Sequence, residues 1–246
     1  MQETIVILLG LIFGSFTNVL IYRLPRGESV VFPASRCPSC GQPLKAGDLL
    51  PVLSYLFLKG RCRYCKAGIS PRYPLVEALT AAAFLLVYIC WGLSLTTLSG
   101  MVLSLVLICA GFTDLDTGLI PDRLTIPAVI IGLGLSVFTV GIKAALIGGL
   151  GYGGLFLALA LISRGGMGGG DIKLAAVIGV FCGWPLVLTA LVLVGFMGGF
   201  YALFLLLSGK ANRKSEVRFG PLLSLGAFLA FNYGMVLSSW YLSWFH

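Results

Sequence analysis

The sequence predicts an all-α polytopic membrane protein of about eight transmembrane helices, with a small polar domain between the first and second helices. Hydrophobic residues make up 58% of the 246 residues and charged residues 11%, against about a quarter charged in soluble domains. The mean hydropathy is +1.00. Apolar runs long enough to span a membrane recur, and they are continuous, which excludes the alternating pattern of spanning strands. The 33 glycines indicate close packing between membrane helices.

Residues 4–22 form the first predicted span, and we assign residues 1–22 to it. No basic flank precedes this run, whereas Arg23 and Arg26 follow it, so we interpret it as a retained span and not as a cleaved signal peptide. Asn18 inside an apolar helix is costly unless it is hydrogen-bonded. We favour a helix-packing contact for Asn18 over a catalytic role.

Residues 23–73 form the polar domain. Nine lysines and arginines stand there against Glu28 and Asp48, for a net charge of +7. Basic residues beside apolar runs are typical of the cytoplasmic side, so the sequence predicts a cytoplasmic polar domain and an N-terminus outside. The same placement accounts for the total charge of +8 and argues against nucleic-acid binding.

Four cysteines in the polar domain form two C-x-x-C pairs that 21 residues separate: Cys37, Cys40, Cys62 and Cys65. Four thiolates suit tetrahedral Zn²⁺ and leave no open position, so we predict a structural zinc site. Two disulfides are the alternative, which a reducing cytosol opposes. Gly41 and Gly68 suit tight turns next to the pairs. The remaining cysteines, Cys90, Cys109 and Cys182, fit packing roles within spans.

Residues 74–246 are predicted to form the transmembrane core. Its apolar segments are 74–91, 96–113, 124–141, 143–163, 172–183, 185–208 and 220–244. Segment 172–183 is too short to cross about 30 Å of hydrocarbon alone. The basic residues alternate between loops as the topology requires: Lys143 is outside, and the inner set is Arg123, Arg164, Lys210, Arg213, Lys214 and Arg218.

Glycine spacing within the apolar segments indicates helix contacts. Residues 149–154 match G-x-G-x-x-G, but no strand precedes them, so a dinucleotide site is not predicted. Gly149 and Gly153, like Gly195 and Gly199, are four residues apart, the spacing of small residues at helix contacts.

Acidic residues mark one end of the predicted core. Asp114, Asp116 and Asp122 follow the third span, and Asp171 precedes the sixth, so the topology places both groups at the inner face. Two adjacent carboxylates share one proton; the charged one activates water while the protonated one donates to a peptide carbonyl. Capping and turn roles are the alternative. The single histidine, His246, is predicted on the outer side, which excludes His-dependent catalysis at the inner face.

The glycine run 165–170 lets the backbone approach an extended substrate strand, and a helix beginning at Asp171 would place its carboxylate at a positive end. These properties favour a peptidase site. The partner of Asp171 remains open between Asp114 and Asp116; the spacing to Ile120 and Pro121 favours Asp114.

Several motifs resemble the bacterial type IV prepilin peptidases, which are bifunctional leader peptidases and N-methyltransferases. The matching stretches are residues 14–25, the paired cysteines, residues 70–77, residues 114–122, and the G-x-G-D motif at 168–171. The resemblance covers nearly the whole chain. It implies that Asp114 and Asp171 are catalytic, and we expect Gly168, Gly170, Asp116 and Lys173 to support them.

The resemblance also implies a substrate, a second activity and a location. The substrate is a prepilin or pseudopilin with a basic leader, and S-adenosylmethionine supplies a methyl group to the new N-terminus. No nucleotide-binding loop locates the methyl-donor site; Glu77 and Arg72 are the candidates, with an ion pair or membrane-edge anchor as their alternative. The expected location is the bacterial inner membrane, with the lipid bilayer as a partner.

Three further hypotheses stay open from the residues alone. A peptidase without methyl transfer, an ion-coupled transporter that uses the membrane-edge carboxylates, and a structural secretion component with a zinc module all fit the composition. The sequence does not distinguish pilus assembly from type II secretion, and it does not predict an oligomeric state.

Overall fold

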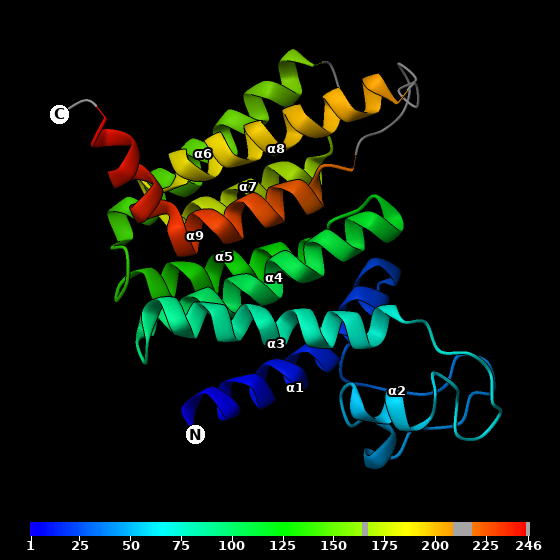
Figure 1. Ribbon diagram of the computed structural model, residues 1–246. Helices are drawn as coiled ribbons and strands as arrows, with labels where there is room; N and C mark the ends of the chain where they lie inside the picture. The colour runs from blue at the N-terminus through cyan, green and yellow to red at the C-terminus, as the bar shows by residue number, and fades with distance from the viewer. Residues whose placement is uncertain (164–166, 209–217, 245–246) are drawn as a thin grey trace. The chain divides into compact units, whose positions relative to one another are not determined.

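The computed structural model describes residues 1–163, 167–208 and 218–244 (Figure 1). They form two compact units, the N-terminal unit Met1–Gly92 and the C-terminal unit Leu93–His246. The predicted division at residues 22/23 and 73/74 stays an interpretation of the sequence. The following residues of the sequence analysis lie outside the described residues: Arg164, Gly165, Gly166, Lys210, Arg213, Lys214 and His246.

Each of the eight predicted apolar segments forms an α-helix, and the described residues contain no strand, which confirms the all-α class. The helices are α1 (Gln2–Arg23), α3 (Arg72–Trp91), α4 (Leu95–Thr117), α5 (Asp122–Ser136), α6 (Ile142–Ile162), α7 (Gly169–Cys182), α8 (Val187–Leu207) and α9 (Gly220–Leu242). A short helix, α2 (Leu53–Phe57), lies in the polar domain, as do the 3₁₀ turns η1 (Leu24–Arg26) and η2 (Ala46–Asp48).

Six of the described helices are long and apolar enough to cross a membrane: α1, α3, α4, α6, α8 and α9. The other two are shorter, because α5 has 15 residues and α7 has 14. At 1.5 Å per residue they extend roughly 22 and 21 Å, less than the ~30 Å of a bilayer core. For α5 this corrects the predicted segment 124–141: the helix ends at Ser136, and Gly141 then adopts a φ of 87°.

Helix α7 is the centre of the C-terminal unit, where it packs against α5, α6 and α9. Its side chains from Leu174 to Cys182 are almost all buried. Contact with α6 is very close, because a Cβ atom added to Gly148 would lie 2.3 Å from the Gly179 carbonyl oxygen. A helix enclosed by other helices in this way does not need the length that lipid contact demands.

The glycine predictions have mixed outcomes. Added Cβ atoms at Gly149 and Gly153 would lie 2.7 and 2.9 Å from side-chain atoms of α7, which confirms a helix contact there. The prediction for Gly195 and Gly199 is wrong: neither has a described heavy atom within 4 Å of an added Cβ. A Cβ at either position of α8 would therefore touch none of the described residues.

In the N-terminal unit, α1 and α3 form an antiparallel pair (Figure 1). A Cβ added at Gly10 would lie 2.5 Å from the Ala81 Cα, and one added at Gly14 would lie 2.7 Å from the Glu77 Cα. The two glycines therefore allow the helix backbones to touch. Asn18 extends the contact, since its Nδ2 donates to the Tyr73 carbonyl at 3.0 Å. This confirms the helix-packing contact expected for Asn18.

The polar domain connects the two helices of this pair. Where α1 ends, the buried Arg23 guanidinium donates to the carbonyls of Ser29 (2.9 Å) and Pro33 (2.7 Å). On the far side of the loop, Val52 donates its N–H to Glu77 Oε2 at 2.7 Å, so α3 holds the start of α2. The polar domain is thus attached to both helices of its own unit.

Candidate functional site

Asp114 lies on the last turn of α4 and is 7% exposed. Its Oδ2 accepts a 3.0 Å hydrogen bond from the backbone N–H of Gly220, the first residue of α9. The first turn of a helix has free N–H groups and a positive partial charge, so it suits a carboxylate. Asp116 is exposed, because two residues along a helix turn a side chain by about 200°.

Asp171 lies on the first turn of α7 and is 9% exposed. Its backbone N–H donates to the Gly168 carbonyl at 3.1 Å. Its Oδ1 is buried and has no hydrogen-bond partner among the described residues. Helix α7 is in contact with α4, and its first turn lies against Ile120, six residues after Asp114. The fold therefore places Asp114 and Asp171 at the same end of the unit, from positions far apart in the sequence.

Contacts of residues near Asp114 and Asp171 hold the adjoining helix ends in place. An added Cβ at Gly170 would lie 2.9 Å from the Ile120 Cβ, so α7 begins directly against the segment before α5. Lys173 forms an ion pair with Asp122, the first residue of α5. At Gly168, by contrast, an added Cβ would meet Asp171 Oδ2 only at 3.7 Å, which is ordinary contact.

Sequence reasoning missed Gly220. An added Cβ there would lie 2.8 Å from Asp114 Oδ2, so the residue provides both a hydrogen-bond donor and the space for the carboxylate. The signal in the sequence is Gly220-Pro221 at the start of the last apolar segment, which is typical of a helix beginning. One end of the C-terminal unit thus gathers the end of α4 and the beginnings of α5, α7 and α9.

The four cysteines of the polar domain also come together. Their Sγ atoms lie within 4.8 Å of one another, and Cys37 Sγ is 3.9 Å from Cys65 Sγ. Tetrahedral zinc with Zn–S bonds of ~2.3 Å places its sulfur ligands ~3.8 Å apart. Backbone N–H groups of Cys40 and Ser39 lower the pKa of the Cys37 thiol to about 6, whereas burial and the neighbouring thiols raise the pKa of Cys65 to about 11; the support for a metal site is therefore the sulfur geometry. The cluster fits a closed metal site.

Each cysteine pair forms a tight turn. Gly41 donates to the Cys37 carbonyl at 2.9 Å, and Lys66 donates to the Cys62 carbonyl at 3.0 Å. Gly41 has a φ of 72°, as the sequence suggested, but in the second turn the left-handed residue is Lys66, with a φ of 61°. The prediction for Gly68 is therefore wrong, because Gly68 instead pairs with Arg61 in an isolated β-bridge.

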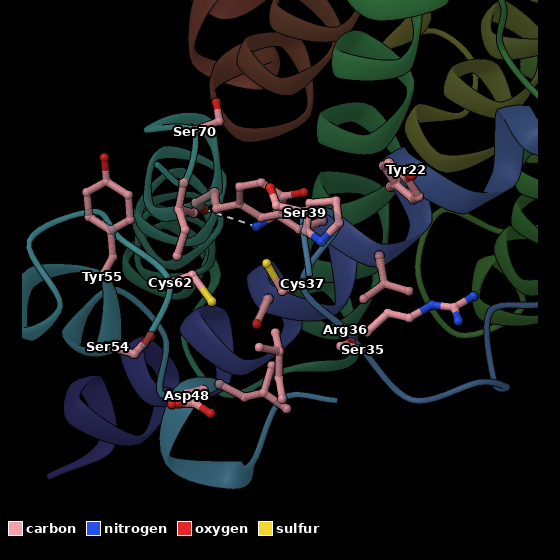
Figure 2. Close-up of a pocket in the computed structure, with 18 of the residues that line it drawn as sticks. Tyr22, Ser35, Arg36, Cys37, Ser39, Asp48, Ser54, Tyr55, Cys62 and Ser70 are labelled. Atoms are coloured by element: carbon pink, nitrogen blue, oxygen red, sulfur yellow. Dashed lines mark hydrogen bonds between the residues drawn. The ribbon is translucent and has the colours of Figure 1, made fainter. Parts of the chain in front are cut away.

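A cavity of about 740 Å³ lies in the N-terminal unit (Figure 2). Its wall comes from the end of α1, the polar domain and the first turns of α3. Cys37 and Cys62 are part of this wall, so the cysteine cluster shapes it. Of the two candidates for the methyl-donor site, Glu77 lines the cavity; Arg72 is not part of its wall.

Two protein-family models match the chain, and each match lies within one of the two units. Residues 8–91 match the Bacterial Peptidase A24 N-terminal domain, and residues 101–203 match the Type IV leader peptidase family. Curated relatives named "Prepilin leader peptidase/N-methyltransferase" align along nearly the whole chain. The protein of Aeromonas salmonicida (strain A449) is 35% identical over 276 residues, covering 98% of this chain and 94% of the relative.

Two further relatives carry the same name. That of Bacillus subtilis (strain 168) is 36% identical over 243 residues and covers 97% of both chains. That of Neisseria gonorrhoeae is 36% identical over 254 residues, with coverage of 91% of this chain and 87% of the relative. No solved structure matches the chain significantly.

Proposed function

This chain belongs to the type IV leader peptidase family, and we propose that it removes the basic leader from prepilins or pseudopilins and then methylates the exposed N-terminal amine. Family membership, together with six helices of spanning length, makes it a multi-pass protein of the inner membrane. It also argues against the ion-coupled transporter and the structural component that the sequence left open.

For leader cleavage, the observation that supports the proposal is the placement of two buried carboxylates, Asp114 and Asp171, at the same end of the C-terminal unit. Such a pair shares one proton, so one carboxylate draws a proton from the attacking water while the other donates to the scissile carbonyl. Asp171 Oδ1, which has no partner among the described residues, is the oxygen atom free for this exchange. Gly220 holds Asp114 in position.

The test compares leader cleavage of a prepilin by the variants Asp114→Asn, Asp171→Asn and Asp116→Asn in detergent. We expect the first two to lose roughly a thousandfold in rate, within the range of general acid–base catalysis. Asp116→Asn is the matched control and should stay within about threefold, because its side chain is exposed whereas those of Asp114 and Asp171 are buried. Loss of cleavage in Asp116→Asn with retention in Asp114→Asn would overturn the assignment.

Membrane orientation is the second part of the proposal. The net charge of +7 in the polar domain supports its cytoplasmic location, with the N-terminus outside. The described end of the C-terminal unit that carries Asp114 and Asp171 then faces the cytoplasm, where the basic leader of a prepilin remains. Thiol labelling of a Cys introduced at Glu28 in intact and lysed cells tests this; labelling in intact cells by an impermeant reagent would contradict it.

We also assign structural zinc to the cysteine cluster, supported by the sulfur spacing and by the four thiol ligands. S-adenosylmethionine is the proposed methyl donor, and the cavity in the N-terminal unit is its proposed site. A volume of about 740 Å³ lies within the range of small-molecule sites. Purified protein with a labelled methyl donor and cleaved pilin separates this enzyme from a peptidase without methyl transfer.

A further inference from the structure

Polar side chains lie along the contact between α1 and α3. Ser15 on α1 and Glu77 on α3 line the same cavity, and a Cβ added at the neighbouring Gly14 would lie 2.7 Å from the Glu77 Cα. Asn18 donates to the Tyr73 carbonyl. Asn18 follows Ser15 by three residues and Glu77 follows Tyr73 by four, so each pair lies on one helix face. Glu77 and Asn18 are therefore neighbours, about one helical turn apart.

Both side chains line the cavity. Asn18 is 3% exposed, and its Oδ1 has no hydrogen-bond partner among the described residues. Glu77 is 8% exposed; its Oε2 is held by the Val52 N–H. A buried carboxylate beside an unpaired amide oxygen offers hydrogen-bond acceptors and a negative charge, which are what a primary ammonium group needs from its site.

The cavity has two chemically different ends. Glu77 is five residues from the start of α3 and Asn18 five from the end of α1, so each lies on the order of 8 Å inside its helix. The polar domain contributes other parts of the wall, including Ser35, Ser39 and Ser54, which Figure 2 labels. A water-soluble methyl donor suits the polar end, whereas an amine on an apolar helix suits the end between α1 and α3.

We propose that Glu77 and Asn18 bind the free α-amine of the newly exposed N-terminal residue, and that Glu77 is the base for its methylation. This inference rests on the proposed methyl transfer. Glu77 first takes a proton from the ammonium group, which leaves a neutral amine. The amine nitrogen then forms a bond to the methyl carbon, the methyl–sulfur bond breaks with its electron pair on sulfur, and the sulfonium becomes a thioether.

Other charged side chains of the cavity wall are engaged elsewhere or lie in the polar domain. Arg23 is bonded to two carbonyls, and Asp48 is paired with Arg63 at 2.6 Å. Glu28 and Arg36 belong to the polar domain, and both lie outside the α1–α3 contact. This leaves Glu77 as the carboxylate positioned between the helices.

The first experiment measures equilibrium binding, without any methyl donor, to the full chain in detergent. The probes are a peptide of Phe followed by apolar residues, with a free N-terminus, and the same peptide N-acetylated. We expect the wild type to bind the free amine at least tenfold more tightly, and Glu77→Gln to reduce this preference below threefold. Gln keeps an acceptor for the Val52 N–H, so the loop stays attached.

Thr80→Val is the matched control. Thr80 is a fully buried polar residue one turn further along α3. Its hydroxyl donates to the Val76 carbonyl of the same helix, and the residue is not part of the cavity wall. This variant should keep the amine preference. If Glu77→Gln is not monodisperse, Glu77→Asp replaces it; a shortened carboxylate should keep amine binding and lower the methylation kcat at least tenfold.

The second experiment measures turnover with S-adenosylmethionine and cleaved pilin. Glu77→Gln should lower the methylation kcat at least a hundredfold, leave the KM for S-adenosylmethionine within threefold, and leave leader cleavage within threefold. An unchanged amine preference would overturn the proposal, as would a tenfold weaker binding of S-adenosylmethionine, which would assign Glu77 to the donor's own ammonium. A wild type that methylates no pilin would instead overturn the proposed function.

Discussion

The N-terminal and C-terminal units both join helices through glycines, yet they hold their buried carboxylates differently. Glu77 in the N-terminal unit is fixed by the Val52 N–H, next to a wide cavity. In the C-terminal unit, Asp171 has an oxygen atom without a described partner and lies at the same end of the unit as Asp114. A fixed carboxylate beside a cavity suits binding, whereas two adjacent carboxylates suit proton exchange.

The units also differ in what keeps them ordered. Between Gly27 and Ser70, the described regular structure is only a 3₁₀ turn and the short helix α2. A segment of that size buries too little apolar surface to fold alone, so a metal in the proposed cysteine site would add to the order that the bonds of Arg23 and Glu77 supply. In the C-terminal unit, α7 is enclosed by its neighbours and needs no metal.

Removal of the proposed zinc should therefore impair the N-terminal unit and leave the C-terminal unit folded. For Cys62→Ser we expect a more than hundredfold loss of methyl transfer to cleaved pilin, because Cys62 forms part of the cavity wall and structural zinc supplies folding free energy. Far-UV circular dichroism should change little, since the helices remain. Methyl-transfer assays and limited proteolysis of residues 27–70 measure the outcome.

Cys90→Ser is the control for this substitution, because Cys90 lies on α3 outside the cluster. It should retain methyl transfer. Full activity in Cys62→Ser protein that elemental analysis shows to be free of metal would break the comparison between a metal-ordered unit and a helix-packed one.

Helix packing in the C-terminal unit is tested by Gly148→Ala. The new Cβ would lie 2.3 Å from the Gly179 carbonyl oxygen, and overpacking of this kind costs about 1–3 kcal/mol. We expect a lower midpoint of thermal unfolding in detergent. Gly151→Ala, three residues along α6, has no described heavy atom within 4 Å and should be neutral or up to about 1 kcal/mol stabilising. Equal midpoints would refute the close contact.

The sequence predicted the fold well where periodicity and composition determine it. All eight predicted apolar segments form helices, because a continuous apolar run can be recognised from residues that are neighbours in the sequence. The end of α5 at Ser136 was not predictable from hydropathy, because residues 137–141 are as apolar as the helix before them. Similarly, Gly195 and Gly199 have contact spacing, but spacing alone does not tell which helix faces become paired.

The candidate site was predictable in its chemistry and less so in its supports. Asp114 and Asp171 could be identified because carboxylates are rare in such a chain. Gly220 was missed because its contribution is a backbone N–H, which every residue but proline has, and because 106 residues separate it from Asp114. The bond from Val52 to Glu77 was hidden for the same reason, and Val52 adopts a φ of 60° that no β-branched residue favours.

Small displacements at the paired acids should reduce leader cleavage. In Gly170→Ala, the new Cβ lies 2.9 Å from the Ile120 Cβ, so the first turn of α7 must move and carry Asp171 with it. We expect a roughly tenfold slower cleavage, since sub-ångström misplacement of catalytic groups is costly. Gly169→Ala, with no described heavy atom within 4 Å, is the neighbouring control and should stay within about twofold.

Slower leader cleavage by Gly169→Ala than by Gly170→Ala would show that the glycines before Asp171 matter for backbone flexibility and not for the contact with Ile120. Methyl transfer to pilin that is already cleaved should be unaffected in both variants. That assay keeps the effect within the C-terminal unit.

The smallest expected effect concerns a surface contact of the polar domain. The Arg63 guanidinium and the Tyr64 hydroxyl bond Asp48, at 2.6 and 2.9 Å, and the Arg63 hydrogen bond holds the pKa of Asp48 below its usual range. Because the folded pKa is depressed, this stabilisation is present above the unfolded pKa of about 3.9 and is lost as the pH falls through the folded pKa. Asp48→Asn should therefore lower the unfolding midpoint slightly and by the same amount at every pH between 6 and 8.

Salt provides the sharper measurement for Asp48. Although the Asp48 side chain is only 5% exposed, the Arg63 side chain is 53% exposed, so the ion pair remains open to screening by salt. The difference in midpoint between wild type and Asp48→Asn should shrink when NaCl is raised to about 1 M, a concentration at which the Debye length is ~3 Å. A difference that instead vanished between pH 8 and pH 6 would point to a group other than Asp48.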